Sequence, residues 1–385
     1  MSLFPTYNRF PFTIESGEGT VVRDDHGKEY LDFVSGIAVC NLGHRPSVVK
    51  KAIQDQMERV WHVSNLYQIP IQKEAAQLLT EAAGLDYAFF CNSGAEANEA
   101  AIKLARKHTG KDKIITFQQS FHGRTFATMS ATGQEKVQEG FGALLPTFEH
   151  LPFNDTDAVL ELNDDSVAAI MVEVVQGEGG VVEAEESFLQ AIENKCAELG
   201  ALLIIDEVQT GAGRTGTPFA FQHYGLSPDI ITSAKGLGSG FPVGAMAGKA
   251  YLSESFSAGS HGSTFGGNPL SSAAVKATLS TIFNDQFLHE VNEKSSYFMK
   301  QLKENLENVQ GVAEVRGKGL MIGIEVDEQA IDYVHKLREK GLLAVLAGPK
   351  VVRLLPPLTV SYEELDQAAE MLQTTLSKQS ANLKL

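Results

Sequence analysis

The sequence predicts an α/β fold in which a large domain is followed by a smaller α+β domain. Its 385 residues suffice for two compact domains, and 43% hydrophobic with 21% charged residues is typical of a globular protein. The middle of the chain alternates short apolar runs with helical periodicity, and this alternation ends near residue 283. We expect an N-terminal segment over 1–47 that packs with the small domain, a large domain over 48–283 and the small domain over 284–385.

The large domain begins with helical periodicity over residues 48–63 and 71–83, which predicts two helices. A short apolar run over 87–91 then meets Asn-Ser-Gly and an Ala-rich helical pattern, as expected for a strand, a turn and a helix. The later apolar runs lack period-two alternation, so they indicate a sheet buried on both faces. These runs, with the helical SFLQAIENKCAELG between the second and the third, are KIITF, VAAIMVEVV, ALLIIDEV, DIITSAK and PVGAMAG.

The C-terminal part mixes strands and helices in a different order. EVRGKGLMIGIEV, LLAVL and VVRLLPPLTV are expected strands, and QAIDYVHKLREKG is an expected helix. Ser361 and Glu364 have the spacing of a capping box, which places the start of a final helix. Near the N-terminus, TVVRDDHGKEYLDF predicts two short strands around residues 25–27 that pack on this domain.

Charge and cysteine content exclude several classes of protein. The net charge of −16 and the absence of a dense Lys/Arg run argue against nucleic acid or anionic lipid as partners. Cys40, Cys91 and Cys196 are widely spaced and contain no CxxC pair, which argues against a disulfide framework or a metal site. We find neither a signal peptide nor a stretch of about 18 apolar residues. We expect a soluble, unprocessed cytoplasmic protein with no membrane partner.

The most informative segment is ALLIIDEVQTGAGRTG, in which an apolar strand ends in Asp206 and Glu207. Acids at the carboxyl end of such a strand lie where α/β folds bind ligands. GAGRTG matches GxGxxG in form, but no helical pattern follows it, which disfavours a dinucleotide site. The alternative is a pair of exposed acids at a strand end.

Two further segments are candidates for a ligand site. Lys235 follows an apolar strand and precedes a glycine-rich loop, where a lysine is either catalytic or simply solvated. Ser93, Gly94 and Ala95 stand at a helix N-terminus, whose free N–H groups suit a phosphate. An ordinary serine N-cap explains that pattern equally well.

Together these segments resemble the class III (subgroup II) aminotransferases of the fold-type I pyridoxal-phosphate enzymes. The family-like stretches follow one another in the family's order across nearly the whole chain: NLGH, CNSGAEANEAAIKLAR, SFHGRT, VQGEGG, LLIIDEVQTGAGRTG, PDIITSAKGLGSGFPVGA, HGSTFGGNP, RGKGL and VRLLPPL. The resemblance implies a large pyridoxal-phosphate-binding domain around a mostly parallel seven-stranded sheet flanked by helices, with a small α+β domain.

The resemblance also assigns cofactor roles. It implies that Lys235 holds pyridoxal 5'-phosphate as a Schiff base and shuttles the proton, and that Asp206 pairs with the protonated pyridine nitrogen, which keeps the ring an electron sink. Thr264 is expected to reach the phosphate of the neighbouring subunit, which implies a homodimer with shared active sites. The other implied cofactor contacts are Phe121 and Val208 on the ring faces, Gln209 near the ring hydroxyl, Gly94 and Ala95 at the phosphate, and Glu207.

Substrate carboxylates are expected to bind arginines, because a guanidinium grips a carboxylate with two parallel hydrogen bonds. By resemblance, Arg124 binds a substrate carboxylate with Ser263 beside it, and Arg353 binds the α-carboxylate of 2-oxoglutarate or glutamate. Glu178 is implied to pair with Arg353 when an ω-amino substrate is bound and to swing away for glutamate.

The expected reaction moves the terminal amino group of N2-acetyl-L-ornithine to 2-oxoglutarate, giving N-acetylglutamate 5-semialdehyde and L-glutamate for arginine biosynthesis. The related ornithine δ-aminotransferases typically carry a Tyr at the position of Ile37 that contacts the free α-amino group. By this resemblance the apolar Ile37 favours an acylated α-nitrogen over the free ammonium of ornithine, because a buried ammonium without a partner is costly. Ornithine, 4-aminobutyrate and succinyl-diaminopimelate remain alternative donors. A glutamate-1-semialdehyde aminomutase and a non-catalytic relic are less favoured, because Glu178, Arg353, Lys235 and Asp206 are all present.

Overall fold

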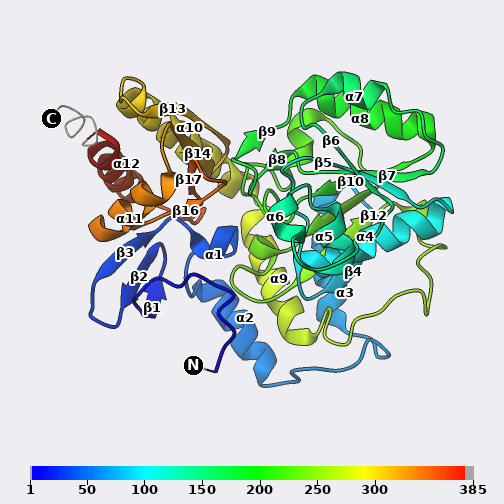
Figure 1. Ribbon diagram of the computed structural model, residues 1–385. Helices are drawn as coiled ribbons and strands as arrows, with labels where there is room; N and C mark the ends of the chain where they lie inside the picture. Colours follow the sequence, from blue (N-terminus) through cyan, green and yellow to red (C-terminus); the bar gives the residue numbers. More distant parts are fainter. Residues whose placement is uncertain (1, 378–385) are drawn as a thin grey trace.

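The structure is a computed structural model that describes residues 2–377. Met1 and residues 378–385, which the expected N-terminal and C-terminal parts include, lie outside the described residues. In Figure 1 the cyan to yellow-green middle of the chain forms the larger lobe, and the blue N-terminal strands lie beside the orange and red C-terminal elements. No helix within residues 2–377 is long and apolar enough to cross a membrane. The boundaries at 48 and 284 stay a prediction.

The predicted seven-stranded, mostly parallel sheet is confirmed. In spatial order the strands are β4 (Tyr87–Cys91), β12 (Gly244–Gly248), β11 (Ile230–Ser233), β10 (Leu202–Asp206), β7 (Val167–Val172), β5 (Lys113–Phe117) and β6 (Phe148–Leu151). β12 runs antiparallel to its neighbours β4 and β11, and the remaining pairs, from β11 through to β6, are parallel.

Both faces of this sheet are apolar, as the strand pattern predicts. Successive residues of β10 point to opposite faces: Ile204 packs in one cluster with Ala101, and Ile205 packs in another with Leu79 and Phe188. Neither face is exposed to water, so the strands show no polar alternation. The helices of this part of the chain are α3 (Pro70–Ala83), α4 (Gly94–Thr109), α5 (Phe126–Ala131), α6 (Glu135–Gln138), α7 (Thr156–Leu160), α8 (Glu186–Leu199) and α9 (Pro269–Ile282), with α2 (Ser47–Met57) packed on α9.

Helix α4 shows how local sequence fixes an element that serves the site. Ser93 is the N-cap, and its side chain accepts a hydrogen bond from the N–H of Glu96. At the other end Gly110 is the left-handed C-cap, a conformation that glycine adopts without a Cβ penalty. The helix therefore starts and stops where the sequence signals it, directly after β4.

Helix α2 differs from its prediction, because it ends at Met57 and not at residue 63. The apolar residues beyond it do not pack on the core: Val60 is 39% and Trp61 is 60% exposed. Their spacing extends the helical pattern in sequence, but no buried face stabilises a further turn.

The C-terminal elements form a second core. The predicted capping box is present, since Ser361 accepts from the N–H of Glu364 while the Glu364 side chain accepts from the N–H of Ser361. Strands β13 (Val312–Lys318), β14 (Met321–Val326), β17 (Val351–Leu354) and β16 (Val345–Leu346) make a sheet in that order. The helices are α10 (Asp285–Leu306), α11 (Ala330–Lys340) and α12 (Tyr362–Leu376).

The N-terminal strands join a sheet with a strand from the C-terminal part. β1 (Ile14–Glu18), β2 (Val21–Asp24) and β3 (Glu29–Asp32) form a meander, and β3 pairs in parallel with β15 (Leu342–Leu343). A ribbon of β8 (Val175–Gln176) and β9 (Val182–Glu183), together with short 3₁₀ turns at Ala220–Tyr224, Lys235–Gly238 and Ala250–Leu252, completes the described chain. No α-helix opens directly after GAGRTG, in line with the rejected dinucleotide motif.

Candidate active site

A cavity of about 420 Å³ lies at the carboxyl ends of β7, β10 and β11. This is the edge of a parallel sheet at which α/β proteins bind ligands, and the volume suits a small molecule. Three parts of the cavity wall are the segments that the sequence predicts as candidates for a ligand site: the N-terminus of α4, the residues that follow β10 and the loop after β11.

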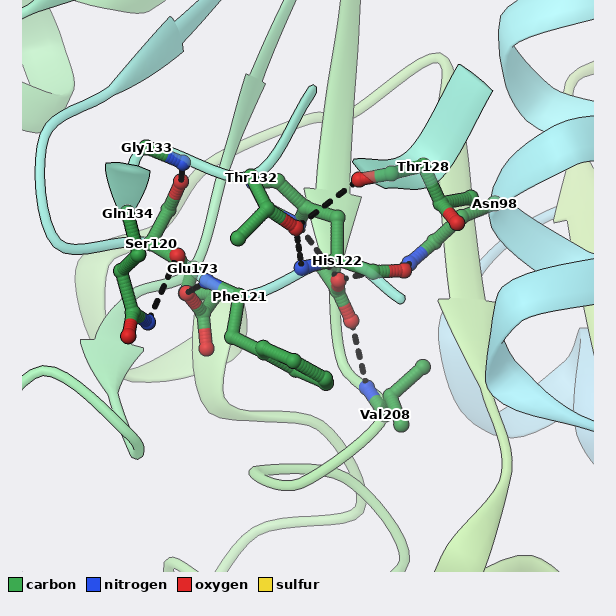
Figure 2. A network of polar contacts seen from close by, with 11 residues as sticks. Asn98, Ser120, Phe121, His122, Thr128, Thr132, Gly133, Gln134, Glu173 and Val208 are labelled. Carbon is green, nitrogen blue, oxygen red and sulfur yellow. Dashed lines mark hydrogen bonds and ion pairs between the residues drawn. The ribbon is translucent and has the colours of Figure 1, made fainter. Parts of the chain in front are cut away.

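Asp206 stands at the centre of a buried polar network at the end of β10. One carboxylate oxygen accepts from Asn98 Nδ2 at 2.8 Å and lies 2.7 Å from His122 Nδ1, and the other accepts from the N–H of Val208 at 3.0 Å. Burial pulls the pKa of His122 down, but the hydrogen bond and charge of Asp206 outweigh it, so the pKa is raised. The network holds the His122 imidazole against the carboxylate. Figure 2 shows His122 and Asn98 beside Val208 and Phe121.

His122 and Asn98 were missed by the sequence analysis. His122 follows Phe121 in the SFHGRT stretch, so its residue type was visible, but nothing in the sequence joins it to an acid 84 positions away. Its other ring nitrogen, Nε2, is buried and has no hydrogen-bond partner among the described residues. It is therefore free to bond a group that enters the cavity, which His122 also lines.

Glu173 is a second buried acid that the sequence analysis did not single out. It is 6% exposed, lines the cavity and accepts a hydrogen bond from the N–H of Phe121 at 3.0 Å (Figure 2). Burial raises the pKa of Glu173 to about 7; the positive charge of His122 opposes this shift, and the negative charge of Asp206 adds to it. The sequence does contain a signal for Glu173, because a lone carboxylate inside the apolar run VAAIMVEVV is unusual for a buried strand.

Lys235 lies half-buried in the wall of the cavity at the start of the loop after β11. Its φ of +43° is unusual for a residue with a side chain, and such strain concentrates at functional sites. Burial lowers the pKa of Lys235 below that of an ordinary lysine, although the carboxylate of Glu178 opposes the shift. A lowered pKa makes the amine a better proton acceptor at neutral pH.

The N-terminus of α4 borders the cavity through Ser93, Gly94 and Ala95. Gly94 packs directly against Val208: a Cβ at this position would lie 2.7 Å from Val208 Cγ1. A side chain there would push the helix end away from the loop after β10. The sequence therefore uses glycine where the free N–H groups of the helix must approach that loop closely.

Arg353 and Glu178 form an ion pair beside the cavity, with Arg353 NH1 and Glu178 Oε1 2.7 Å apart. Arg353 is fully buried in β17, and NH1 also donates to Gln209 Oε1 at 3.0 Å and to the carbonyl of Gly177 at 2.9 Å. Burial raises the pKa of Glu178, but Arg353 and Gln209 outweigh it, so the net shift is downward. Glu178 and Gln209 line the cavity, and Arg353 lies behind them.

Arg124, Ser263 and Thr264 lie at the rim. Arg124 lines the cavity and is exposed, with its guanidinium 5.7 Å from the centre of the Phe121 ring. Ser263 Oγ accepts from Asn92 Nδ2 at 3.2 Å, which links it to a residue of the wall. Ser263 and the exposed Thr264 do not themselves line the cavity of this chain.

The structure does not bring Glu207 into the cavity. Its carboxylate points into the core and accepts from Thr210 Oγ1 at 2.6 Å and from the N–H of Phe221 at 2.8 Å. Asp206 is the last residue of β10 and Glu207 follows it in extended backbone, so the two side chains point in opposite directions and only Asp206 faces the cavity.

Ile37 is likewise not part of the wall. It lies in the short turn α1 (Ser35–Ala38), where its φ is +67°, and packs against the apolar cluster that contains Val175 and Val351. Val39, two residues later, lines the cavity instead. The apolar character expected at this part of the pocket is therefore supplied by a neighbouring side chain.

The chain is similar along its whole length to known proteins. The family described as "Aminotransferase class-III" matches residues 4–376. The "Acetylornithine aminotransferase" of Listeria innocua serovar 6a is 57% identical, with 98% of each chain covered. The solved N-acetylornithine aminotransferase of Stenotrophomonas maltophilia K279a is 34% identical with a TM-score of 0.85, covering 97% of this chain and 98% of that one. An ornithine aminotransferase of Toxoplasma gondii, solved with partial occupancy of PLP at its active site, is 32% identical with a TM-score of 0.96, covering 100% and 93%.

Proposed function

Because this chain belongs to the class-III aminotransferases, we propose that it transfers the terminal amino group of N2-acetyl-L-ornithine to 2-oxoglutarate. The products are N-acetylglutamate 5-semialdehyde and L-glutamate, and the reaction serves arginine biosynthesis. The protein is a transaminase that uses pyridoxal phosphate, as its family does. The observation that supports the mechanism most directly is that one cavity contains Lys235, Asp206 and the N-terminus of α4.

The cavity fits pyridoxal phosphate in the chemistry of its polar groups. A helix N-terminus with a glycine in close contact suits the phosphate, and it lies in the same wall as the buried carboxylate of Asp206. His122 and Asn98 hold that carboxylate in place by hydrogen bonds, and Asp206 is the acid that would pair with the pyridine nitrogen of the cofactor. Phe121 and Val208 supply apolar surfaces for the two faces of the ring, and Gln209 is within the same wall.

Lys235 performs the proton transfers. When bound, pyridoxal phosphate withdraws electrons from the carbon that bears the amino group, which makes a proton on that carbon acidic. Lys235 Nζ would accept this proton and later give it back. A basic amine is needed for both steps, and the burial that lowers its pKa keeps a larger neutral fraction available.

Two arginines bind the carboxylates of the substrates. Arg124, exposed at the mouth, takes the carboxylate of the acylated donor, with Ser263 next to it. Arg353 takes the α-carboxylate of 2-oxoglutarate and of glutamate. In the structure Arg353 is ion-paired with Glu178, so this ion pair must break when the keto acid binds to Arg353. One pocket can then accept a donor and an acceptor that differ in charge near the reacting carbon.

The protein acts as a homodimer whose subunits complete one another's sites. Exposed apolar side chains gather near the rim: Trp61 is 60%, Leu66 89% and Phe265 60% exposed. Asn65 Nδ2 donates to the carbonyl of Gly266 at 2.9 Å, so the segment after α2 and the loop of Thr264 lie together. An apolar surface of this kind favours a partner, and Thr264 would face the partner's phosphate.

The dimer test uses two variants that are inactive for different reasons. Lys235→Arg and Thr264→Ala are prepared separately and then mixed under conditions that exchange subunits. Shared sites predict that activity appears on mixing, because one of the two mixed sites has both Lys235 and Thr264. Activity that stays at the level of the unmixed variants would contradict sharing.

The free state of Cys40, Cys91 and Cys196 supports a reducing, cytoplasmic setting.

Ornithine is the second candidate donor, and the high structural similarity to the ornithine aminotransferase of Toxoplasma gondii favours it. The choice is tested by comparing kcat/KM for N-acetylornithine, ornithine, 4-aminobutyrate and N-succinyl-diaminopimelate with 2-oxoglutarate, following glutamate. We expect the acetylated donor to exceed ornithine by at least tenfold, because the pocket wall at Val39 and Phe241 is apolar and suits an uncharged acyl group better than an ammonium. A preference for free ornithine would overturn the proposed donor.

A further inference from the structure

Arg214, in the GAGRTG stretch, is a fully buried guanidinium with 0% exposure. Its partners within residues 2–377 are the carbonyl of Leu320 at 3.0 Å, the carbonyl of Pro356 at 2.5 Å and Asn41 Oδ1 at 2.6 Å. None of these is a carboxylate. Burial lowers the pKa of Arg214 to about 9, which reflects the cost of keeping a charge there without a counter-ion. An arrangement this costly calls for a reason beyond packing.

The three acceptors come from three separate parts of the chain. Asn41 belongs to the N-terminal segment, Leu320 to the turn between β13 and β14, and Pro356 to the segment that follows β17. The contact with the β13–β14 turn is reciprocal, because the N–H of Leu320 donates to the carbonyl of Arg214 at 3.0 Å. A Cβ on Gly319 would lie 2.4 Å from that carbonyl oxygen, so only glycine permits the approach. The RGKGL and NLGH stretches thus meet at Arg214.

One end of this junction touches the loop of Lys235. Asn41 is 1% exposed and packs against Gly236, where a Cβ would lie 2.2 Å from Asn41 Nδ2. The next residue, Leu42, donates its N–H to Ser239 Oγ at 2.9 Å. The N-terminal segment is therefore fixed on the loop that begins with Lys235.

The other end touches the strand of Arg353. Pro356 is three residues beyond Arg353. Residues on both sides of Pro356 are hydrogen-bonded to the N-terminal segment that contains Asn41. The N–H of Leu355 donates to the carbonyl of Phe33 at 2.6 Å, and that of Leu358 donates to the carbonyl of Asn41 at 2.8 Å. Through Asn41 and Pro356, Arg214 thus connects the residue that moves the proton with the residue that binds the keto acid.

We propose that Arg214 is a positioning residue that sets the placement of Arg353 relative to Lys235, and thereby the affinity for the α-carboxylate of the keto acid. This rests on the proposed role of Arg353. Arg124 and Ser263 have no hydrogen bond to Arg214, Asn41, Leu320 or Pro356, so the acylated donor is affected less. A planar fork with several donors is required, because a lysine ammonium cannot reach three acceptors in that arrangement.

The test measures KM for 2-oxoglutarate and for N-acetylornithine in the holoenzyme with Arg214→Lys. We expect the KM for 2-oxoglutarate to rise on the order of tenfold or more, because small misplacements of a binding group cost up to a hundredfold. The KM for the donor should change by less than about threefold, because Arg124 and Ser263 are not bonded to the junction and should stay in place. The visible absorbance of the bound cofactor should be retained. Equal changes in both KM values would overturn the proposal and leave a structural role only.

Three further variants keep the test decisive. Asn41→Ala removes one acceptor and should give the same pattern more weakly, so it replaces Arg214→Lys if that variant does not fold. Arg106→Lys is the control, since Arg106 is a partly buried arginine that donates to Thr147 within the large lobe and touches no part of the junction. Arg353→Lys separates the two hypotheses. If it leaves the KM for 2-oxoglutarate unchanged, the proposed role of Arg353 is wrong. If it raises that KM while Arg214→Lys and Asn41→Ala do not, the inference is wrong.

Discussion

The two ends of the seven-stranded sheet border cavities of similar size and different chemistry. The cavity at the carboxyl ends of β7, β10 and β11 measures about 420 Å³, and one at the opposite end, beside the starts of β10 and β11, about 500 Å³. At the far end Asp229 accepts from Lys249 at 3.0 Å, from Tyr251 at 2.8 Å and from the N–H of Leu203 at 2.8 Å. Its carboxylate is thus satisfied within the protein.

The cavity at the carboxyl ends keeps polar groups that the protein itself does not satisfy. His122 Nε2 has no partner among the described residues, Glu173 has a pKa raised to about 7, and Lys235 has a lowered pKa. Volume therefore does not distinguish the two ends of the sheet. What distinguishes them is that one end satisfies the carboxylate of Asp229 with three hydrogen bonds, while the other contains the unpaired His122 Nε2 and two groups with shifted pKa values, Glu173 and Lys235.

The largest difference should follow from Lys235→Arg. Arginine keeps the positive charge but is not deprotonated in proteins, so the site loses the base for both proton transfers. We expect a loss of kcat on the order of a thousandfold or more. The matched control is Lys249→Arg in the far cavity, which should leave kcat within about twofold, because its contact with Asp229 is a partly exposed ion pair. Retained turnover in Lys235→Arg would exclude Lys235 as the proton carrier.

Asp206→Asn should have the second largest effect. The change keeps the shape of the side chain but removes the negative charge that, in the proposed mechanism, pairs with the ring nitrogen, and we expect kcat to fall about 10²- to 10³-fold. The pKa of His122 should also fall, because the charge of Asp206 is what raises it against burial. The His122 titration can be followed by NMR alongside the kinetics. If both remain as in the unaltered protein, the role assigned to Asp206 is incorrect.

Glu178→Ala should change the balance between the half-reactions. Without its partner Arg353 is free for an α-carboxylate, so the KM for 2-oxoglutarate should fall about tenfold, as expected for one charge-assisted hydrogen bond worth about 1.5–3 kcal/mol. The first half-reaction with N-acetylornithine should not improve. Stopped-flow measurement of the two half-reactions gives the ratio directly. Glu183→Ala, which removes an acid paired with Lys318 outside the cavity, serves as control. An unchanged ratio would exclude the exchange of partners.

Glu173→Gln should alter the pH dependence of stability in the cofactor-free protein. The pKa of Glu173 is about 7 in the folded state against 4.5 for an ordinary glutamate. Between these values the folded state binds more protons than the unfolded state, so the free energy of unfolding falls as the pH rises. Glutamine removes this dependence, which amounts to at most about 3 kcal/mol.

The measurement is chemical denaturation between pH 4.5 and 7.5, which spans the two values. The control is Glu186→Gln, at an exposed position in the first turn of α8. Parallel stability profiles for Glu173→Gln and the unaltered protein would mean that Glu173 is ionised in the folded state.

Asp229→Asn should have the smallest effect on catalysis. Its partners belong to the far end of the sheet, so kcat and both KM values should stay within about twofold. Stability should fall by about 1–2 kcal/mol, since three hydrogen bonds are weakened without leaving a buried charge unpaired. A large loss of activity in this variant would break the contrast between the two cavities.

The order and type of most elements could be predicted from the sequence, because they depend on local patterns. Apolar strands without alternation, the Ser93 cap of α4 and the capping box at Ser361 all appear as expected. The edge strand β6 was missed, because FEHL is short and only partly buried. The predicted extension of α2 beyond Met57 failed for a related reason, since periodicity predicts a helix only where its apolar face finds a core.

The sequence alone determined the sheet, the family resemblance and the candidate residues Lys235, Asp206 and Arg353, because strand ends and motifs are local in the chain. Only the tertiary structure decided which of two adjacent acids faces the cavity, since the pleat turns Asp206 inward and Glu207 into the core. It also decided the pairing of Asp206 with His122 and the three contacts of Arg214, which join residues 84 to 173 positions apart. Contacts over such distances depend on how the elements pack.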